Sequence, residues 1–254
     1  MSFLICTSAT ATFGSLVAVD HIDLIIERHS VVGIGGPNGA GKTTFLDLIS
    51  GLVPLREGGI ELDGVVLDGM PAHKRARLGV ARTFQLNAGF DSMTVYENVL
   101  TAVVFGNQTA SRRKPLWSRA DHHRTCAYLE EFGLTEKTDV EVSRLAALDR
   151  KKLMVVTALA SDPKVLLLDE PVGGLTPTEI DEFADLIIRL KEQGHTIVFI
   201  EHVMSFLTKV ADRAVIMHHG SLIFDGVPSE IAHNETVAEV YLGSAAAQMR
   251  GDLS

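Results

Sequence analysis

The segment at residues 36–43 constrains this chain more than any other part of its sequence. It fits the pattern GxxxxGK[ST] at every defined position, between an apolar run at residues 30–35 and a helix-like stretch at residues 42–50. A glycine-rich turn between a strand and a helix can wrap a phosphate, because its backbone N–H groups point inward at torsions that a side chain would resist. The sequence therefore predicts a phosphate-binding loop.

The residue types in this loop are those that nucleotide binding requires. The helix that starts near Gly41 directs its positive dipole end at the β-phosphate, Lys42 reaches the β- and γ-phosphates, and the Thr43 hydroxyl is a ligand for Mg²⁺. A chance glycine-rich turn is the alternative, and the flanking strand and helix argue against it. The predicted nucleotide-binding residues of the loop and the first helical turn are Gly36, Pro37, Asn38, Gly39, Ala40, Gly41, Lys42, Thr43 and Thr44.

Two adjacent carboxylates, Asp169 and Glu170, follow a fully apolar run at residues 165–168. The carboxyl end of a buried parallel strand opens on the same crevice as a phosphate loop. Asp169 is therefore a predicted ligand in the Mg²⁺ shell, and Glu170 is predicted to polarise an attacking water. A strand that ends in an ordinary solvated turn is the alternative, and the loop at residues 36–43 favours the catalytic interpretation.

Strand and helix patterns alternate along much of the chain, which predicts an α/β fold with a parallel sheet covered by helices. Residues 58–68 read as strand, turn and strand, with Asp63 and Gly64 as a hairpin signal. Thr176 and Glu179 have the spacing of a capping box, which predicts a helix start.

A mostly helical pattern from about residue 88 to residue 160 interrupts this alternation. We expect one domain over residues 1–243, with the helical block as a subdomain. Residues 244–254 are small and polar, and we expect them to form a flexible tail.

The composition narrows the classes of partner. Lys and Arg total 23 against 32 Asp and Glu, a net charge of −9, which disfavours non-specific binding to nucleic acid. The two cysteines, Cys6 and Cys126, lack the spacing of a disulfide framework or a zinc site, which is typical of a reducing compartment. The sequence suggests neither a transmembrane segment nor a signal peptide, so we expect any action at a membrane to depend on partners.

Taken in order, these motifs resemble the ABC ATP-binding cassette over nearly the whole chain. The resemblance implies a P-loop ATPase core with an N-terminal antiparallel β subdomain and an inserted α-helical subdomain, with ATP and Mg²⁺ as ligands. Residues 81–85 look like the Q-loop, so Gln85 is expected to touch the metal–water site and to sense a membrane subunit. His202, after Glu201, looks like the switch histidine that contacts the γ-phosphate. Phe13 lies where the family places an aromatic that stacks on adenine; a core phenylalanine is the alternative.

Four stretches resemble the branched-chain amino-acid importers within this family. Uptake systems for urea and short amides look similar, so the solute stays open. The resemblance implies two membrane-spanning permease subunits, a second ABC ATPase in a homo- or heterodimer and, indirectly, a solute-binding protein. It also implies a peripheral location at the cytoplasmic face of the cell membrane. The stretches are residues 13–20, 81–85, 93–100 and 200–204.

The signature segment of the family, roughly Leu-Ser-Gly-Gly-Gln, falls on residues 145–149, where only Leu145 matches. Ala146 has no hydroxyl, Leu148 is bulky, and Asp149 brings a negative charge towards a phosphate. We expect Lys151 and Lys152 to offset that charge. Thr176 also stands where the wider family often has Asp. These departures predict an asymmetric pair with a second ATPase whose signature is intact.

Three other interpretations remain. A regulatory cassette that binds ATP with little hydrolysis fits the altered signature, although Glu170 argues against it. A soluble ABC ATPase in translation or DNA repair usually has two cassettes or a long coiled coil. The acidic charge also disfavours it, despite the basic cluster at residues 112–114. A small-molecule kinase on a P-loop core would not need Gln85 and His202 in this order.

Overall fold

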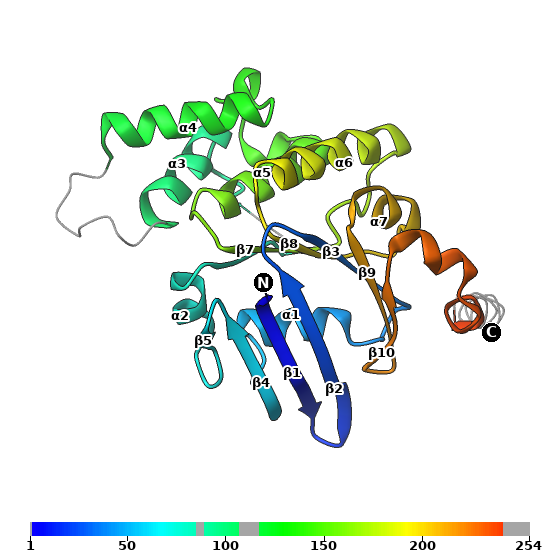
Figure 1. The fold of residues 1–254 in the computed structure, drawn as a ribbon. Coiled ribbons are helices and arrows are strands. Elements are labelled where there is room, and N and C mark those ends of the chain that lie inside the picture. Colours follow the sequence, from blue (N-terminus) through cyan, green and yellow to red (C-terminus); the bar gives the residue numbers. More distant parts are fainter. Residues whose placement is uncertain (1, 85–88, 107–116, 241–254) are drawn as a thin grey trace.

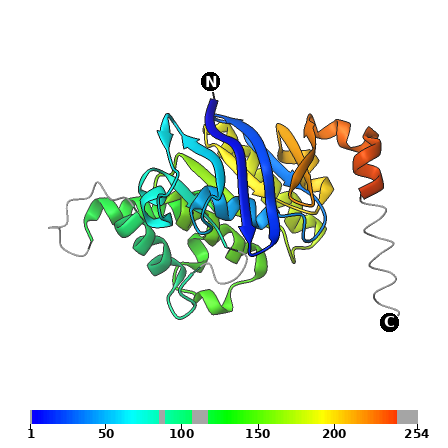
Figure 2. The same ribbon diagram turned by 90° about the horizontal axis from the view of Figure 1, so that it is seen from below.

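The computed structural model describes residues 2–84, 89–106 and 117–240. Its elements form layers (Figure 1): an antiparallel sheet, a mostly parallel sheet, and helices on the far side of the parallel sheet. Helix α1 (Lys42–Ser50) contacts strands of both sheets and so lies between them. Figure 2 shows the same arrangement from the side of the antiparallel strands. None of the described helices combines the length and apolar character needed to cross a membrane.

The antiparallel sheet has the strand order β2-β1-β4-β5. The hairpin expected around Asp63 and Gly64 is confirmed, and both residues have positive φ, 53° and 79°, as a type I′ turn requires. This sheet carries Phe13 at the end of its longest hairpin. Its strands are β1 (Ser2–Phe13), β2 (Leu16–Glu27), β4 (Glu57–Leu62) and β5 (Val65–Val66).

The second sheet has the order β10-β9-β3-β8-β7-β6. Its neighbours pair in parallel except for the β9–β10 hairpin, so the predicted parallel sheet is confirmed. Parallel pairing brings the carboxyl ends of the three central strands to one edge, where ligands bind in open α/β sheets. The strands are β3 (Val31–Gly35), β6 (Val80–Arg82), β7 (Val165–Asp169), β8 (Ile197–Ile200), β9 (Arg213–His218) and β10 (Ser221–Gly226).

Strand β7 shows why the central strands are apolar without alternation. Val165 and Leu167 pack in the core that includes α1 and the antiparallel sheet, whereas Leu166 and Leu168 pack in the core on the helical side. A strand covered on both faces has no solvent side, so every residue is apolar until Asp169.

Helices cover the face of the parallel sheet opposite α1. Helix α6 begins at the predicted capping box, in which Thr176 and Glu179 each accept the expected hydrogen bonds. Figure 1 shows α3 and α4 far from the antiparallel strands, with α5 and α6 between them and α7. The helices of this layer are α3 (Val95–Gly106), α4 (Arg119–Glu131), α5 (Ala147–Leu159), α6 (Pro177–Glu192) and α7 (Met204–Val210).

Several short elements are absent from the sequence prediction. They include helix α2 (Ala72–Arg77), strand β6 and three turns of 3₁₀ helix, whose few residues leave no periodic pattern. The 3₁₀ turns are η1 (Thr135–Lys137), η2 (Val142–Arg144) and η3 (Pro228–His233). The tail expected at residues 244–254 and the basic cluster at residues 112–114 lie outside the described residues.

Candidate functional site

The phosphate loop joins β3 to α1, and two of its glycines are required by close contacts. A Cβ on Gly36, where φ is +140°, would lie 2.3 Å from the carbonyl oxygen of Met217 in β9. A Cβ on Gly41, where φ is +98°, would lie 2.1 Å from the carbonyl oxygen of Ala18 in β2. The loop is therefore fixed between one strand of each sheet, and no side chain can be accommodated at either position.

Lys42 turns back onto the loop that precedes it. Its Nζ donates to the carbonyl oxygens of Gly36 at 2.7 Å and Pro37 at 2.9 Å. Burial lowers the pKa of the Lys42 ammonium, and the carboxylates of Glu170 and Asp169 oppose this shift. A buried cation whose partners are neutral carbonyls is a ready site for a phosphate.

A hollow of about 410 Å³ lies beside the loop and joins it to the tip of the antiparallel sheet. Phe13 is 52% exposed there, so it is not a core phenylalanine, and Leu16 and Val17 are also exposed. Glu170 also lines the hollow. The remaining lining is formed by Ala18, Asn38, Gly39, Ala40, Gly41, Lys42, Thr43, Thr44, His219 and Gly220.

Asp169 has one carboxylate oxygen engaged and one free. Its Oδ2 accepts a hydrogen bond from Arg82 Nη2 at 2.9 Å, whereas its buried Oδ1 has no hydrogen-bond partner. Burial raises the pKa of the Asp169 carboxyl above its ordinary value, and Arg82 opposes that shift. An orphaned, buried carboxylate oxygen at the end of β7, on the same edge of the sheet as the phosphate loop, fits a hard cation such as Mg²⁺.

The described residues contain no cluster of three or more His, Cys, Asp or Glu side chains able to hold a metal ion. Mg²⁺ sites in proteins commonly use one or two protein ligands together with phosphate oxygens and water. Thr43 and Asp169 are the residues here that could fill that role.

Glu170 has an unusual backbone conformation for its residue type. Its φ is +47°, a left-handed value that costs energy for any residue with a side chain. Three backbone hydrogen bonds hold it there: its N–H donates to Ile200 O at 3.0 Å, and its own carbonyl accepts from Lys151 Nζ at 2.8 Å and from Gly173 N at 3.3 Å. The turn after β7 is thus fixed by β8 on one side and by α5 on the other.

Glu201, fully buried at the end of β8, joins the loop that follows β7 to the loop that follows β8. Its Oε1 accepts from Val172 N at 2.9 Å, and its Oε2 accepts from His202 N at 3.0 Å and Val203 N at 3.2 Å. His202 itself is exposed and does not line the hollow in the described part of the chain. Gln85 lies outside the described residues.

The segment at residues 145–149 corrects one expectation. Lys151 and Lys152 do not offset the charge of Asp149, because Lys151 bonds Glu170 O and Lys152 bonds Glu182 on α6. Asp149 is instead buried and ion-paired with Lys137. Its charge is thus neutralised within this chain.

The start of helix α5 keeps its backbone donors. Ala146 is the N-cap residue and makes no side-chain capping bond. Leu148, in the first turn, is buried. The first turn can still present N–H groups, as expected for a helix N-terminus.

Sequence reasoning missed several residues of this region. The sequence motifs include Arg82 only within residues 81–85 and Glu201 only as the neighbour of His202, and no motif includes His219. The burial of an ionisable residue at a strand end could have indicated the first two, but partners far apart in the chain are not visible in a pattern. The turn between β9 and β10 carries His219, and nothing local links that turn to the phosphate loop.

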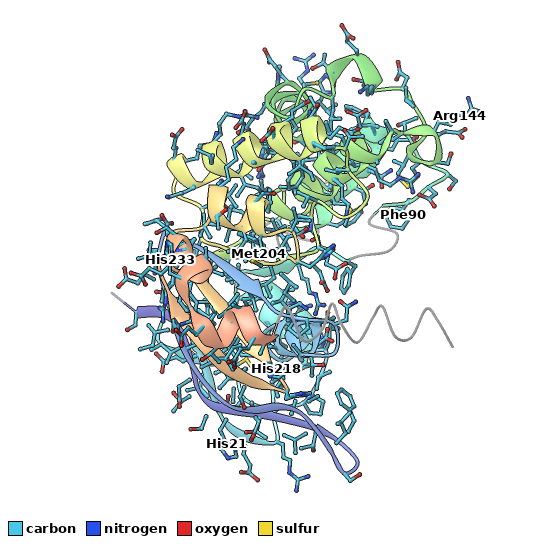
Figure 3. The ribbon with its side chains drawn as sticks, turned by 90° about the vertical axis from the view of Figure 1, so that its right-hand side faces the viewer. His21, Phe90, Arg144, Met204, His218 and His233 are labelled. Atoms are coloured by element: carbon cyan, nitrogen blue, oxygen red, sulfur yellow. The ribbon has the colours of Figure 1, made fainter. Side chains whose placement is uncertain are left out.

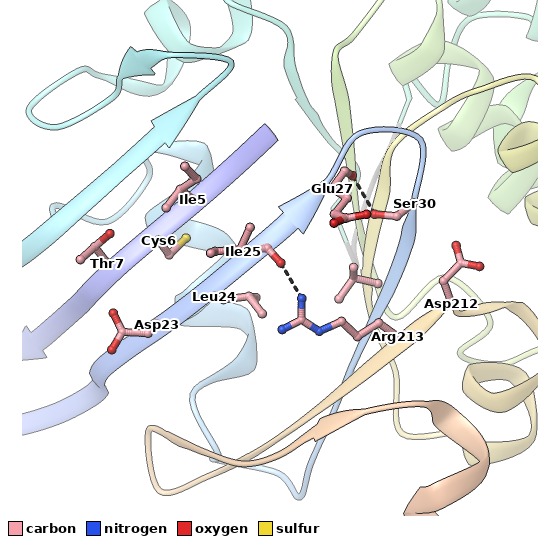
Figure 4. Close-up of a pocket in the computed structure, with 11 residues that line it drawn as sticks. Ile5, Cys6, Thr7, Asp23, Leu24, Ile25, Glu27, Ser30, Asp212 and Arg213 are labelled. Carbon is pink, nitrogen blue, oxygen red and sulfur yellow. Dashed lines mark hydrogen bonds between the residues drawn. The ribbon is translucent and has the colours of Figure 1, made fainter. Parts of the chain in front are cut away.

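A second hollow, of about 630 Å³, lies between the two sheets and away from the phosphate loop (Figure 4). Two of its charged side chains have partners: Arg213 bonds Ile25 O and Asp225, and Asp212 accepts from Val31 N and pairs with Lys191. These contacts join the antiparallel sheet to β9 and give the hollow a structural role.

Comparisons with known proteins follow the same motifs. The ABC transporter family model matches residues 19–173. BraF of Pseudomonas aeruginosa, a high-affinity branched-chain amino acid transport ATP-binding protein, is 37% identical over 93% of this chain and 96% of its own. LivG of Salmonella typhimurium, described in the same way, is 36% identical over 92% of this chain and 94% of its own. A crystal structure of a nucleotide-free ATP-binding cassette from an ABC transporter matches with a TM-score of 0.85 at 25% identity. The match covers 95% of this chain and 99% of that structure's chain.

Proposed function

Because this chain belongs to the ABC transporter family, we propose that it is the ATP-hydrolysing subunit of an importer for branched-chain amino acids or similar small amides. The observation that carries the proposal is one edge of the sheet where the phosphate loop, the free Oδ1 of Asp169 and the strained Glu170 meet. The names of BraF and LivG support the class of solute.

In this proposal each residue has a defined task. The loop N–H groups and Lys42 bind the phosphates, and Thr43 and Asp169 hold Mg²⁺, which neutralises phosphate charge when bound. Glu170 accepts hydrogen bonds from the attacking water and orients it. Gln85 and His202 complete the site from their loops, His202 moving towards the γ-phosphate. The backbone at Glu170 does not need to move, because Lys151 and β8 already hold it.

The proposed importer function also implies the partners of this chain. We place two permease subunits, a second cassette and, indirectly, a solute-binding protein in the complex, with this chain at the cytoplasmic face of the membrane. One domain spans residues 1–243 and includes a helical subdomain at about residues 88–160. The altered signature at residues 145–149 supports a heterodimer, because it lacks a hydroxyl and a small residue for close approach to the partner's nucleotide.

Exposed aromatic side chains support a contact with the permease. Phe84 and Phe90 flank residues 85–88 and are both largely exposed. Figure 3 shows Phe90 at the edge of the helical region, on the side of the molecule that also carries Arg144. Apolar side chains that water surrounds in the free subunit are suited to an interface.

Recovery of the tagged chain from gently solubilised native membranes tests this assembly. We expect two polytopic membrane polypeptides and a second cassette with an intact signature to be recovered with it. A Phe90→Asp variant should lose the membrane polypeptides while still binding ATP. Val227→Asp, another exposed apolar position at the opposite edge after β10, should retain them. Recovery of the chain alone or with ribosomes, or a stable ATP-dependent homodimer with rapid turnover, would contradict the proposal.

Stacking of the adenine on Phe13 gives a second prediction. Loss of a stacked aromatic costs about 1–3 kcal/mol, so Phe13→Ala should weaken ATP affinity by about 5- to 150-fold. Titration with a fluorescent ATP analogue measures this change. Phe105→Ala, which removes another exposed phenylalanine from α3, is the control and should leave affinity unchanged. Equal ATP affinities for wild type and both variants would show that Phe13 does not stack on the adenine.

A further inference from the structure

Arg82 is a buried cation between two carboxylates from different parts of the site. Its side chain is 6% exposed at the end of β6. Nη2 donates to Asp169 Oδ2 at 2.9 Å, and Nη1 forms an ion pair with Asp47 on α1 and lies 3.2 Å from Ser50 Oγ. The guanidinium therefore joins the helix that follows the phosphate loop to the strand that ends in Asp169.

The next two residues attach the same segment to β7. Thr83 N donates to Leu167 O at 2.9 Å, and Asp169 N lies 3.4 Å from Thr83 Oγ1. The ring of Phe84 lies 5.3 Å from the Arg82 guanidinium carbon, within the range of a cation–π contact. Residues 82–84 thus hold Asp169 at both its backbone and its side chain, immediately before Gln85.

The consequence for Asp169 is a fixed carboxylate. With Oδ2 held by Arg82, rotation of the carboxylate is restricted and Oδ1 is left free in a buried position. A planar guanidinium can hold two carboxylates at once because its N–H groups diverge in a rigid fork. A lysine ammonium is a point charge on a flexible stem and would not fix both partners in the same way.

We propose that Arg82 is a positioning residue that orients Asp169 for Mg²⁺ and ties it to α1 through Asp47. This inference rests on the proposed function, since it concerns the metal that accompanies ATP. Arg82 touches neither nucleotide nor water in this role, and it acts only through Asp169. Its effect should therefore appear in the metal dependence of nucleotide binding.

The test compares Arg82→Lys and Arg82→Met with Arg75→Met in the full chain. Arg75 is the matched control: it is also buried and also bonds α1, through Leu48 O and Ile49 O, but it does not contact Asp169. Two quantities are measured: the affinity for a fluorescent ATP analogue in EDTA, and the Mg²⁺ concentration that gives half of the metal-dependent change. Binding of Mn²⁺ in the presence of ADP, followed by electron paramagnetic resonance, gives an independent metal affinity.

Residues that orient a metal ligand typically change metal affinity by about 10- to 100-fold, so both Arg82 variants should need that much more Mg²⁺. Their affinity in EDTA should stay within about twofold of wild type, because the loop and Lys42 are untouched. Arg75→Met should shift neither quantity. If Arg82→Met does not fold, Arg82→Lys and Asp47→Asn provide the test. The Mg²⁺ requirement of Asp47→Asn should then lie between those of wild type and Arg82→Lys.

A folded Arg82→Lys protein with wild-type Mg²⁺ and Mn²⁺ dependence would overturn the inference. This inference rests on one part of the proposed function, Mg²⁺-dependent ATP binding, and failure of that part gives a different result, since the wild-type chain would then bind nucleotide without any dependence on Mg²⁺. An equal loss of affinity with and without metal would also overturn it, because that pattern indicates general damage to the site.

Discussion

The Glu170→Gln variant should hydrolyse ATP about 10²- to 10⁴-fold more slowly than wild type and bind ATP with nearly unchanged affinity. Glutamine has almost the same size as glutamate, and the hydrogen bonds to Ile200 and Lys151 are made by the backbone of this residue. The substitution therefore removes the negative charge that polarises the water and leaves the strained turn in place. The change should appear in kcat.

The measurement is steady-state phosphate release by the complex recovered from membranes, together with ATP affinity of the purified chain. Glu192→Gln, an exposed position at the end of α6, controls for the loss of one negative charge. Unchanged turnover in Glu170→Gln would show that Glu170 does not polarise the water, and would favour the regulatory cassette. A large loss of ATP affinity would instead indicate that the substitution disturbs the loop.

The sequence predicts those features whose causes are local. The capping box of Thr176 and Glu179 and the turn at Asp63 and Gly64 depend on residues no more than three positions apart, and both were confirmed. The alternation of strands and helices likewise follows from patterns within each segment. The glycine-rich loop belongs to this class, because its flanking strand and helix are visible beside it.

Features that depend on distant contacts were not predictable. Asp149 was expected to be offset by Lys151 and Lys152, but Lys151, two residues along the helix, points to a different face and reaches Glu170. Lys152, three residues along, pairs instead with Glu182 on α6, and the partner of Asp149 is Lys137 in η1. The link between Arg82, Asp47 and Asp169 likewise joins positions 35 and 87 residues apart.

A prediction about the stability of the fold rests on Glu201. Its carboxylate accepts three backbone N–H groups and is fully buried. In Glu201→Gln the amide NH₂ replaces one acceptor oxygen and faces at least one N–H donor. A buried donor left without an acceptor costs about 1–3 kcal/mol, so the free energy of unfolding should fall by that amount. For a chain of this length each kcal/mol lowers Tm by about 2–4 °C.

Glu192→Gln serves again as the control and should leave Tm unchanged, because surface substitutions have little effect. Glu201→Leu, which keeps the bulk but satisfies none of the three donors, should be less stable than Glu201→Gln. Equal stability of wild type and both Glu201 variants in denaturant unfolding would show that these hydrogen bonds of Glu201 contribute nothing.

The stability difference between wild type and Glu201→Gln should depend on pH, and the direction of that dependence follows from the pKa of Glu201. Burial raises the pKa of Glu201 above its ordinary value of 4.5, although three backbone N–H groups oppose the shift. Between the ordinary and the raised pKa the folded protein holds more protons at this group than the unfolded chain does, so its contribution to stability falls as pH rises. That contribution is fully present below about pH 4.5. Glu201→Gln has no such titration.

The excess stability of wild type over Glu201→Gln should therefore be largest at low pH and should shrink as pH rises above about 4.5. It should not vanish, because the carboxylate that forms as pH rises accepts hydrogen bonds on both oxygens, whereas the amide nitrogen has no lone pair to offer. Chemical unfolding of both proteins across this range measures the difference directly. A difference that grew with pH would mean that the three N–H groups outweigh burial and lower the pKa of Glu201.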